Sequence, residues 1–332
     1  MINLGIIGLG GIARSHLHLG QLRKNGKFFV KAAADIFDDD SLAKKCGIDE
    51  YYNDYRKLLA DPSIDAVLIA TPHHLHEEHC VAAFRAGKQA LIEKPISRDL
   101  REARVIMDAA KEAGTVGMIG FCQRFYPVHA EIKQKLDEGV LGRLVSARID
   151  HYQNFNPAPT SWWRNADMVG GGAVIGSGVH RLDLLRWYFG EPVKVYASAV
   201  HVPKRLDAEA CVHAVIEFDS GVIVNFSINW ASYKFLYGEG ISISGEDGLI
   251  VCRTASSDPH YQIGLGSVEN GALQTVEAKA CETMYDHFAS CIEQGQEPIT
   301  TLEEGYLSLR LVRAIYRSIE TGLPVDPTTV DF

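Results

Sequence analysis

The chain has 332 residues, of which 46% are hydrophobic and 23% charged, and its formal net charge is −9. This length favours two domains of ordinary globular composition. The acidic balance and the lack of a basic tract argue against nucleic acid and anionic membranes as partners. No run of about 18 apolar residues predicts a membrane span.

Seven cysteines are widely spaced along the chain, and none forms a C-x-x-C pair. An odd number of scattered thiols is typical of proteins in a reducing compartment. The sequence runs from Met1 directly into an apolar segment, without a basic region or a cleavage site. We therefore expect a soluble, cytoplasmic protein.

Strands and helices alternate over the first third of the chain. Apolar runs predict strands at residues 2–8, 29–35, 64–71, 89–94 and 115–120. Helical spacing predicts helices at residues 12–24, 39–46, 54–61, 77–87 and 99–113. This alternation predicts an α/β fold in which residues 1–122 form a Rossmann domain with a doubly wound parallel sheet.

The pattern changes after Cys122. A helix is expected at 127–138, and segments of period-2 alternation follow at residues 144–153, 193–202, 210–220, 221–230 and 241–253. Helices are expected again at 283–294 and 302–321. Residues 123–332 are therefore predicted to form a second α/β domain with an open, mostly antiparallel sheet.

A glycine-rich motif follows the first predicted strand. Residues 8–13 read GLGGIA, which is G-x-G-x-x-A. Gly8 permits a tight turn, Gly10 lets the backbone approach a pyrophosphate, and Ala13 lets the helix pack closely on the strand. Asp35 ends the next strand, where a carboxylate would bind ribose hydroxyls and repel a 2′-phosphate, so NAD is favoured over NADP. The predicted cofactor-binding residues of this motif are Gly8, Gly10, Gly11, Ile12 and Asp35.

Two later strand ends are rich in polar residues, namely ATPHHLHEEH at 70–79 and EKPIS at 93–97. Ligands of open α/β sheets bind beyond the carboxyl ends of the strands. Lys94 precedes Pro95, which disfavours helical geometry and is expected to keep Lys94 at the strand end. There a lysine would polarise a substrate hydroxyl; the alternative is a surface lysine on a turn.

The histidines at 73, 74, 76 and 79 suggest a metal site, but the spacing argues against one. The zinc-binding H-E-x-x-H motif is not completed, because Cys80 stands where the second histidine should be. No cysteine pair supports a structural zinc site either. No metal is therefore expected. His76 is expected to line the cofactor cleft, and His74 and His79 to be surface residues.

A further motif, GGGAVIGSGVHRLDLLRWYFG, stands at residues 170–190. It adds to GLGGIA at 8–13, AFRAGKQALIEKPIS at 83–97 and WWR at 162–164. Over nearly the whole chain these motifs resemble the glucose–fructose oxidoreductase / inositol dehydrogenase (Gfo/Idh/MocA) family. The resemblance implies oxidation of a secondary alcohol on a sugar, cyclitol or related polyol, with hydride passing to NAD(P). It also implies that the second domain, residues 123–332, binds substrate and that its open sheet mediates oligomerisation into a homodimer or homotetramer.

The resemblance implies roles for individual residues. Glu93 and Lys94 match the EKP motif, whose lysine is catalytic, and His180 matches the catalytic histidine. Thr71 and Pro72 match the cofactor-site T-P, and His73 replaces a frequent asparagine. Asp183 matches the later aspartate of H-x-x-D. Gly176 departs from the pattern, because many members have an aspartate four residues before the histidine.

These residues suggest a mechanism in which His180 takes the hydroxyl proton and Lys94 stabilises the developing alkoxide. Gly176 cannot orient His180 or raise its pKa, and it leaves room for a bulkier substrate, a water or a residue from another segment. Asp183 would hold the imidazole from the other side, or be a helix charge or a buried hydrogen-bond acceptor. The alternative for His180 itself is a packed helix residue.

Aromatic and basic residues near the glycines are further candidates for substrate binding. Tyr152, Phe155, Trp162 and Trp163 would stack on sugar rings, or pack in the core or an oligomer interface. Arg124 and Arg164 would bind an acidic substrate, or pair on the surface.

Three functions stay open at this point. The leading hypothesis is an NAD-dependent sugar or cyclitol dehydrogenase. The second is an enzyme with tightly bound NAD that uses transient oxidation for elimination, epimerisation or glycoside cleavage. The third is a non-catalytic protein that senses NAD and sugar. Stoichiometric NADH favours the first, solvent deuterium in the product without net NADH favours the second, and binding without turnover favours the third.

Overall fold

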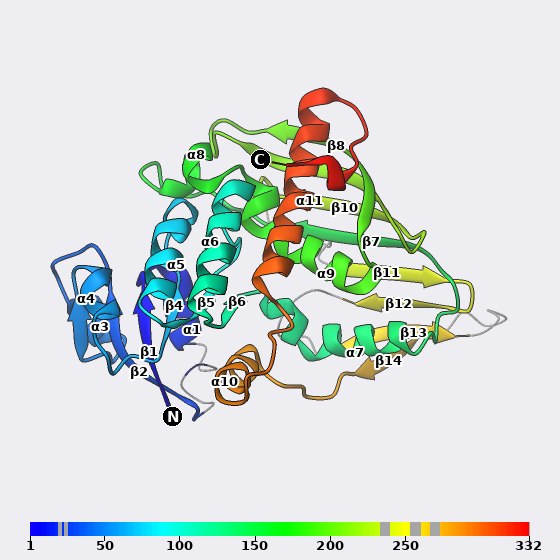
Figure 1. The fold of residues 1–332 in the computed structure, drawn as a ribbon. Coiled ribbons are helices and arrows are strands. Elements are labelled where there is room, and N and C mark those ends of the chain that lie inside the picture. The colour runs from blue at the N-terminus through cyan, green and yellow to red at the C-terminus, as the bar shows by residue number, and fades with distance from the viewer. Residues whose placement is uncertain (19–21, 23–25, 233–239, 253–259, 266–272, 332) are drawn as a thin grey trace. The chain divides into compact units, whose positions relative to one another are not determined.

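The structure is a computed structural model that describes residues 1–18, 22, 26–232, 240–252, 260–265 and 273–331. These residues divide into two compact units (Figure 1). The first contains Met1–Phe121 and Glu282–Tyr306, and the second contains Cys122–Cys281 and Leu307–Phe332. The first unit thus takes up a C-terminal segment that the sequence pattern had assigned to the second domain.

The first unit is built on a six-stranded sheet in which every pair of neighbouring strands is parallel. The strand order is β3-β2-β1-β4-β5-β6, the order of a doubly wound nucleotide-binding fold. The strands are β1 (Ile2–Ile7), β2 (Phe28–Ala34), β3 (Glu50–Tyr52), β4 (Ala66–Ile69), β5 (Gln89–Ile92) and β6 (Gly117–Ile119). The predicted Rossmann fold is confirmed; β3 was not predicted, because three residues are too few to show an alternation.

The helices of the first unit follow the predicted order with shorter bounds. They are α1 (Gly11–His18), α3 (Ser41–Lys45), α4 (Tyr55–Leu59), α5 (His76–Arg85), α6 (Leu100–Ala113) and α10 (Met284–Gln294). The predicted helix at 12–24 is α1 up to His18; residues 19–21 and 23–25 lie outside the described residues. Helix α6 begins where the Asp99 carboxylate accepts the Glu102 N–H and ends at left-handed Gly114, so its caps define its length.

The second unit is built on an eight-stranded sheet in the order β14-β13-β12-β11-β7-β10-β9-β8. Only the β7–β10 pair is parallel, so the prediction of a mostly antiparallel sheet is confirmed. The strands are β7 (Leu144–Tyr152), β8 (Pro192–His201), β9 (Glu209–Phe218), β10 (Ile223–Asn229), β11 (Gly240–Gly245), β12 (Gly248–Cys252), β13 (His260–Leu265) and β14 (Gln274–Glu277). Strands β13 and β14 were not predicted, and the predicted segment 241–253 is the β11–β12 hairpin, with residue 253 outside the described residues.

Helices cover one face of this sheet. They include α7 (Pro127–Asp137), α8 (Ala166–Val169), α9 (Val179–Phe189) and α11 (Leu302–Thr321), whose last fifteen residues belong to this unit. The Ala197 N–H of β8 donates to the Ser318 hydroxyl of α11 at 3.0 Å, which ties that helix to the sheet. Alternate residues of β9 are buried, as expected for a strand with one covered face.

A short helical turn precedes each of the helices α8 and α9. Trp162–Arg164 forms a 3-10 turn, and Val174–Gly178 forms a π-helical turn that runs directly into α9. None of the helices in the described ranges is long and apolar enough to cross a membrane.

Candidate active site

The glycine-rich turn after β1 has the geometry that the motif predicts. Gly8 has a φ of +90°, and a Cβ on it would lie 2.8 Å from Thr71 Cγ2 and 2.9 Å from the Ala70 carbonyl oxygen. Only glycine therefore fits. A Cβ on Gly10 or Gly11 would meet nothing within 4 Å, so this backbone borders open space at the start of α1. Ile12 is 48% exposed beside it.

Asp35 lies against this turn. Its Oδ2 accepts the Leu9 N–H at 2.6 Å, and its Oδ1 accepts the Ile36 N–H at 2.7 Å. The carboxylate is thus oriented by the backbone of the same loop that carries Gly8 and Gly10. This arrangement suits the predicted contact with a nucleotide ribose.

A buried histidine joins the two polar strand ends. His76 is 0% exposed; its Nε2 lies 3.0 Å from the Thr71 carbonyl oxygen and its Nδ1 lies 2.9 Å from the Pro95 carbonyl oxygen. Thr71 follows β4, and Pro95 follows Lys94 after β5. The expectation that His76 lines a cofactor cleft is wrong, because its ring is fully buried and both nitrogens face backbone oxygens. The ring packs between the two loops instead, and in its neutral form it donates one hydrogen bond to one of these carbonyl oxygens.

The neighbouring histidines are also less exposed than expected. His79 is 7% exposed, and its Nδ1 lies 3.0 Å from Thr71 Oγ1, so the expectation of a surface residue is wrong. Burial lowers the pKa of His79 to about 4. His73 is 3% exposed, and its ring centroid lies 5.8 Å from that of His76, whereas His74 is half-buried. Pro72 precedes His73, where the 3-10 turn His73–Leu75 begins.

Lys94 and Glu93 follow β5 at the same edge of the sheet. Lys94 is half-buried, and its peptide bond to Pro95 is cis. Glu93 Oε1 lies 2.6 Å from His16 Nε2 of α1, and His16 Nδ1 contacts the Tyr285 hydroxyl of α10. Burial by itself would raise the pKa of Glu93, but the His16 hydrogen bond and the nearby charges of His16 and Lys94 lower it below its ordinary value. Sequence reasoning missed His16 and Tyr285, which lie 269 residues apart.

His180 lies in the first turn of α9. Nine of the eleven residues of this helix are buried, and the two that are not are His180 and Trp187. Leu182 and Leu184 are fully buried. The leucines are therefore packed helix residues, the alternative considered for His180, whereas His180 itself is half-buried. A half-buried imidazole on a mostly buried helix suits a role in chemistry.

The space beside Gly176 is filled by aromatic rings of the same unit. A Cβ on Gly176 would lie 2.2 Å from Trp230 Cη2 and 3.1 Å from Trp163 Cζ3. Trp230 is 2% exposed, and its Nε1 donates to Ser177 Oγ at 2.7 Å. Of the three predicted occupants, the structure shows a residue from another segment.

Trp230 belongs to an aromatic cluster that also contains Phe155, Trp162 and Trp163. The Trp162 and Trp163 rings stack with centroids 4.3 Å apart, and Phe155 lies 4.4 Å from Trp230. Phe155, Trp162 and Trp163 are half-buried, so they pack together and still present ring surface. Sequence reasoning missed Trp230, although it ends the alternating segment of β10. Tyr152, at the end of β7, lies with its hydroxyl 3.0 Å from Ser227 Oγ.

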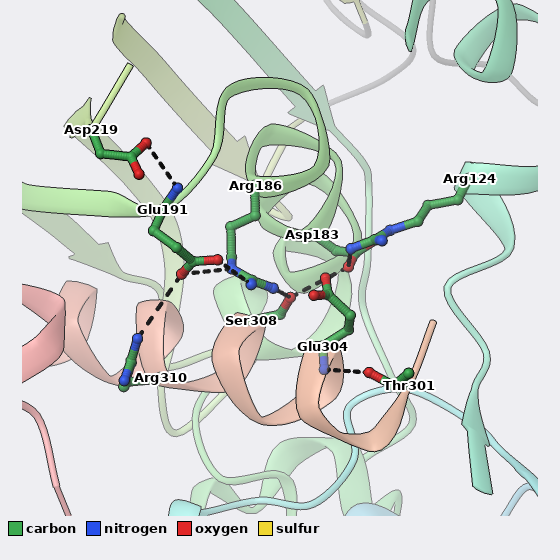
Figure 2. Close-up of polar contacts among 9 residues, drawn as sticks. All are labelled: Arg124, Asp183, Arg186, Glu191, Asp219, Thr301, Glu304, Ser308 and Arg310. Atoms are coloured by element: carbon green, nitrogen blue, oxygen red, sulfur yellow. Dashed lines mark hydrogen bonds and ion pairs between the residues drawn. The ribbon is translucent and has the colours of Figure 1, made fainter. Parts of the chain in front are cut away.

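Asp183 and Arg124 bind each other. Arg124 Nε and Nη2 donate to the two Asp183 oxygens at 2.9 and 2.6 Å, and the residues are 5% and 0% exposed (Figure 2). Figure 2 shows the contacts continuing through Ser308 to Arg186 and Glu191. Surface pairing is therefore wrong for Arg124, and Asp183 is a buried hydrogen-bond acceptor, which is one of its three predicted roles.

Arg164, the other candidate arginine, is half-buried and donates from Nη2 to the Lys204 carbonyl oxygen at 2.6 Å. No three His, Cys, Asp or Glu side chains within the described ranges are grouped so that they could hold a metal ion.

The comparison with known families agrees with this geometry. Residues 2–121 match the model described as "Oxidoreductase family, NAD-binding Rossmann fold", and residues 133–326 match "Oxidoreductase family, C-terminal alpha/beta domain". The chain belongs to the Gfo/Idh/MocA oxidoreductase family. The predicted resemblance is confirmed, and so is the assignment as an oxidoreductase.

Curated relatives match over most of the chain. A 1,5-anhydro-D-fructose reductase of Ensifer adhaerens is 29% identical over 323 residues, 96% of each chain. A scyllo-inositol 2-dehydrogenase (NAD(+)) of Bacillus subtilis (strain 168) is 27% identical over 306 residues, 86% of this chain and 84% of the relative. A structure of levoglucosan dehydrogenase in complex with NADH and levoglucosan shares the fold, with a TM-score of 0.88 and 24% identity over 98% of this chain and 99% of that one.

Proposed function

We propose that this family member is an NAD-dependent dehydrogenase that oxidises a secondary hydroxyl of a sugar, cyclitol or related polyol. The observation that carries the proposal is the arrangement at one edge of the first unit's sheet. Gly8 packs on Thr71, and the buried ring of His76 contacts the carbonyl oxygens of both Thr71 and Pro95, directly after Lys94. The dinucleotide turn and a lysine are therefore held at the same edge by backbone contacts. The names of the relatives supply the substrate class.

The nucleotide would be held by the Gly8–Ile12 turn, by Asp35 and by the Thr71–His73 loop. When bound, NAD⁺ supplies an acceptor for the hydride of the carbinol carbon. The Lys94 ammonium donates a hydrogen bond to the substrate oxygen and stabilises the charge that develops on it. His180 is the proposed base, which accepts the hydroxyl proton on an imidazole nitrogen. Half-buried Trp162 and Trp163 suit stacking on the apolar faces of a sugar ring.

The proposal is tested by following NADH absorbance with NAD and a panel of cyclitols, aldoses and anhydro sugars. We expect His180→Ala and Lys94→Ala to lower kcat by about a hundredfold or more, as loss of an acid–base or oxyanion-stabilising group does. Arg85→Ala is the control, because Arg85 is an exposed residue at the end of α5. Wild-type kcat in both variants would contradict the assigned roles. Solvent deuterium in the product without net NADH would indicate transient oxidation instead.

NAD is proposed over NADP because the Asp35 carboxylate is fixed beside the nucleotide turn, where a 2′-phosphate would be repelled. We expect Asp35→Ser to raise the KM for NAD and to lower the ratio of kcat/KM for NAD over NADP by about tenfold or more. Asp38→Ser is the matched control, since Asp38 is an exposed carboxylate that accepts a hydrogen bond from the Asn53 side chain. An unchanged ratio in Asp35→Ser would refute the proposed preference.

A homodimer or homotetramer is proposed through the open face of the second sheet. Tyr196 of β8 is the register partner of Val215 of β9, and both side chains are exposed, at 48% and 41%. Ile223 of β10 is 47% exposed on the same face. Exposed apolar side chains on neighbouring strands are typical of an interface. Light scattering of Tyr196→Glu should show a smaller species than the wild type; an unchanged mass would argue for another interface. The cytoplasmic location expected from the sequence also stays a prediction.

A further inference from the structure

The three glycines before the π-helical turn have separate structural causes. Gly170 has a φ of +86° and ends α8 in the left-handed conformation. Gly171 has a φ of +144°, and a Cβ on it would lie 2.2 Å from the Tyr316 hydroxyl oxygen. A Cβ on Gly172 would lie 2.1 Å from the Glu209 carbonyl oxygen. Glu209 of β9 and Tyr316 of α11 therefore press directly against the backbone that precedes His180.

These two residues also bind the amide groups of that backbone. The Tyr316 hydroxyl oxygen accepts the N–H groups of Gly172 at 3.2 Å and Ile175 at 3.3 Å. The same hydroxyl donates to Glu209 Oε1 at 3.0 Å, and this carboxylate oxygen accepts the Val174 N–H, also at 3.0 Å. One phenol and one carboxylate thus satisfy three amides in a stretch of four residues.

The amides concerned are the first of the helical run that continues into α9. The first N–H groups of a helix have no partner within it, and a negative charge near them is favourable. Glu209 is 5% exposed. Burial raises the pKa of Glu209, and the hydrogen bonds from Val174 and Tyr316 offset part of this rise. Glu209 and Tyr316 therefore act as a buried cap, supplied by two other elements.

The cap bears on the direction of His180. A π-helical turn holds one residue more than an α-helical turn, so it rotates the following side chains by about 100° around the axis. Here that turn is Val174–Gly178, and two of the capped amides belong to Val174 and Ile175. Loss of the cap would let the turn relax and would redirect His180 away from its half-buried orientation.

We propose that Glu209 and Tyr316 are positioning residues, which set the orientation of His180 through the backbone of residues 172–175. The inference rests on the proposed function, in which His180 is the base. Neither residue is proposed to contact substrate or cofactor.

The test compares Tyr316→Phe with Tyr261→Phe. Tyr261 is a matched control, because it is 2% exposed in the same unit and its hydroxyl donates to Glu131 Oε1 at 2.8 Å, remote in sequence from the glycine segment. Both variants lose one hydroxyl-to-carboxylate bond. We expect Tyr316→Phe to lower kcat by about tenfold to a hundredfold, with the KM for NAD unchanged, since misplacement of a catalytic group has effects of this size. Tyr261→Phe should retain kcat within about twofold of the wild type.

A conservative substitution supplies the second arm. The side-chain oxygen of Gln accepts the same two hydrogen bonds, so Glu209→Gln should retain most of kcat, whereas Glu209→Ala should lose it as Tyr316→Phe does. Amide hydrogen exchange over residues 170–176 should be faster in Tyr316→Phe and in Glu209→Ala, and unchanged in Tyr261→Phe.

Wild-type kcat in Tyr316→Phe, with His180→Ala inactive, would overturn the inference and leave the proposed function standing. Equal losses of kcat in Tyr316→Phe and Tyr261→Phe would reduce the role to general stability and also overturn it. Full activity in His180→Ala would remove the proposed function, and the inference with it.

Discussion

Replacing Gly176 by aspartate would restore the acid that many family members have, and the structure predicts that the protein will not accept it. The new Cβ would lie 2.2 Å from Trp230 Cη2, more than 1 Å inside an ordinary carbon contact of about 3.5 Å. The ring has little freedom to withdraw, because it is 2% exposed and bonded to Ser177. Overpacking costs about 1–3 kcal/mol, and a buried carboxyl group, neutralised by a proton but without a hydrogen-bond partner, adds about 1–3 kcal/mol.

We therefore expect Gly176→Asp to lower the free energy of unfolding by about 4 kcal/mol, measured by urea unfolding followed by far-ultraviolet circular dichroism. Gly176→Ala should lose about 1–2 kcal/mol, since it adds the clash without the carboxyl group and gains some helix propensity. The decisive comparison is a double-mutant cycle with Trp230→Leu. With the ring removed, the aspartate should cost at least about 1 kcal/mol less than it does beside Trp230.

Two results would refute this reasoning. A wild-type unfolding midpoint for Gly176→Asp would mean that the rings yield easily. Equal costs of the aspartate in both backgrounds would mean that Trp230 is not what excludes it.

Two further predictions concern buried ionisable side chains. Arg124→Met leaves the Asp183 carboxylate buried without its bidentate partner, so it should lower the free energy of unfolding by about 3–5 kcal/mol. The double variant Arg124→Met/Asp183→Leu should lose clearly less than the sum of the two single changes. Additive losses in urea unfolding would contradict the pairing. Burial lowers the pKa of His79 to about 4, from about 6.5 in the unfolded chain. Burial of the neutral His79 ring therefore costs no stability above about pH 6.5. As the pH falls from about 6.5 toward 4, the unfolded chain takes up a proton that the folded protein does not, and the free energy of unfolding drops by up to about 3 kcal/mol. His79→Gln should therefore lose less stability than the wild type over this window, and parallel pH profiles would rule the explanation out.

The residues of the first unit show how far local patterns reach. The alternation of strands and helices and the G-x-G-x-x-A motif with Asp35 predicted the parallel sheet and the nucleotide turn. These features are readable because their causes are local. Gly8 is needed where the chain turns sharply, and a buried parallel strand requires a continuous apolar run. His180 is half-buried on α9, and its role as the base stays a prediction.

The partners of polar and aromatic side chains were not readable in this way. Tertiary packing decided that Asp183 binds Arg124, that His76 binds the backbone of two loops, and that Trp230 fills the space beside Gly176. It also assigned α10 to the first unit, where Tyr285 contacts His16. Most of these pairs lie far apart in the chain, and periodicity reports only which face of an element is buried, not what covers it. The sequence by itself determined the fold class and the nucleotide turn, whereas the three-dimensional packing decided what surrounds the proposed base.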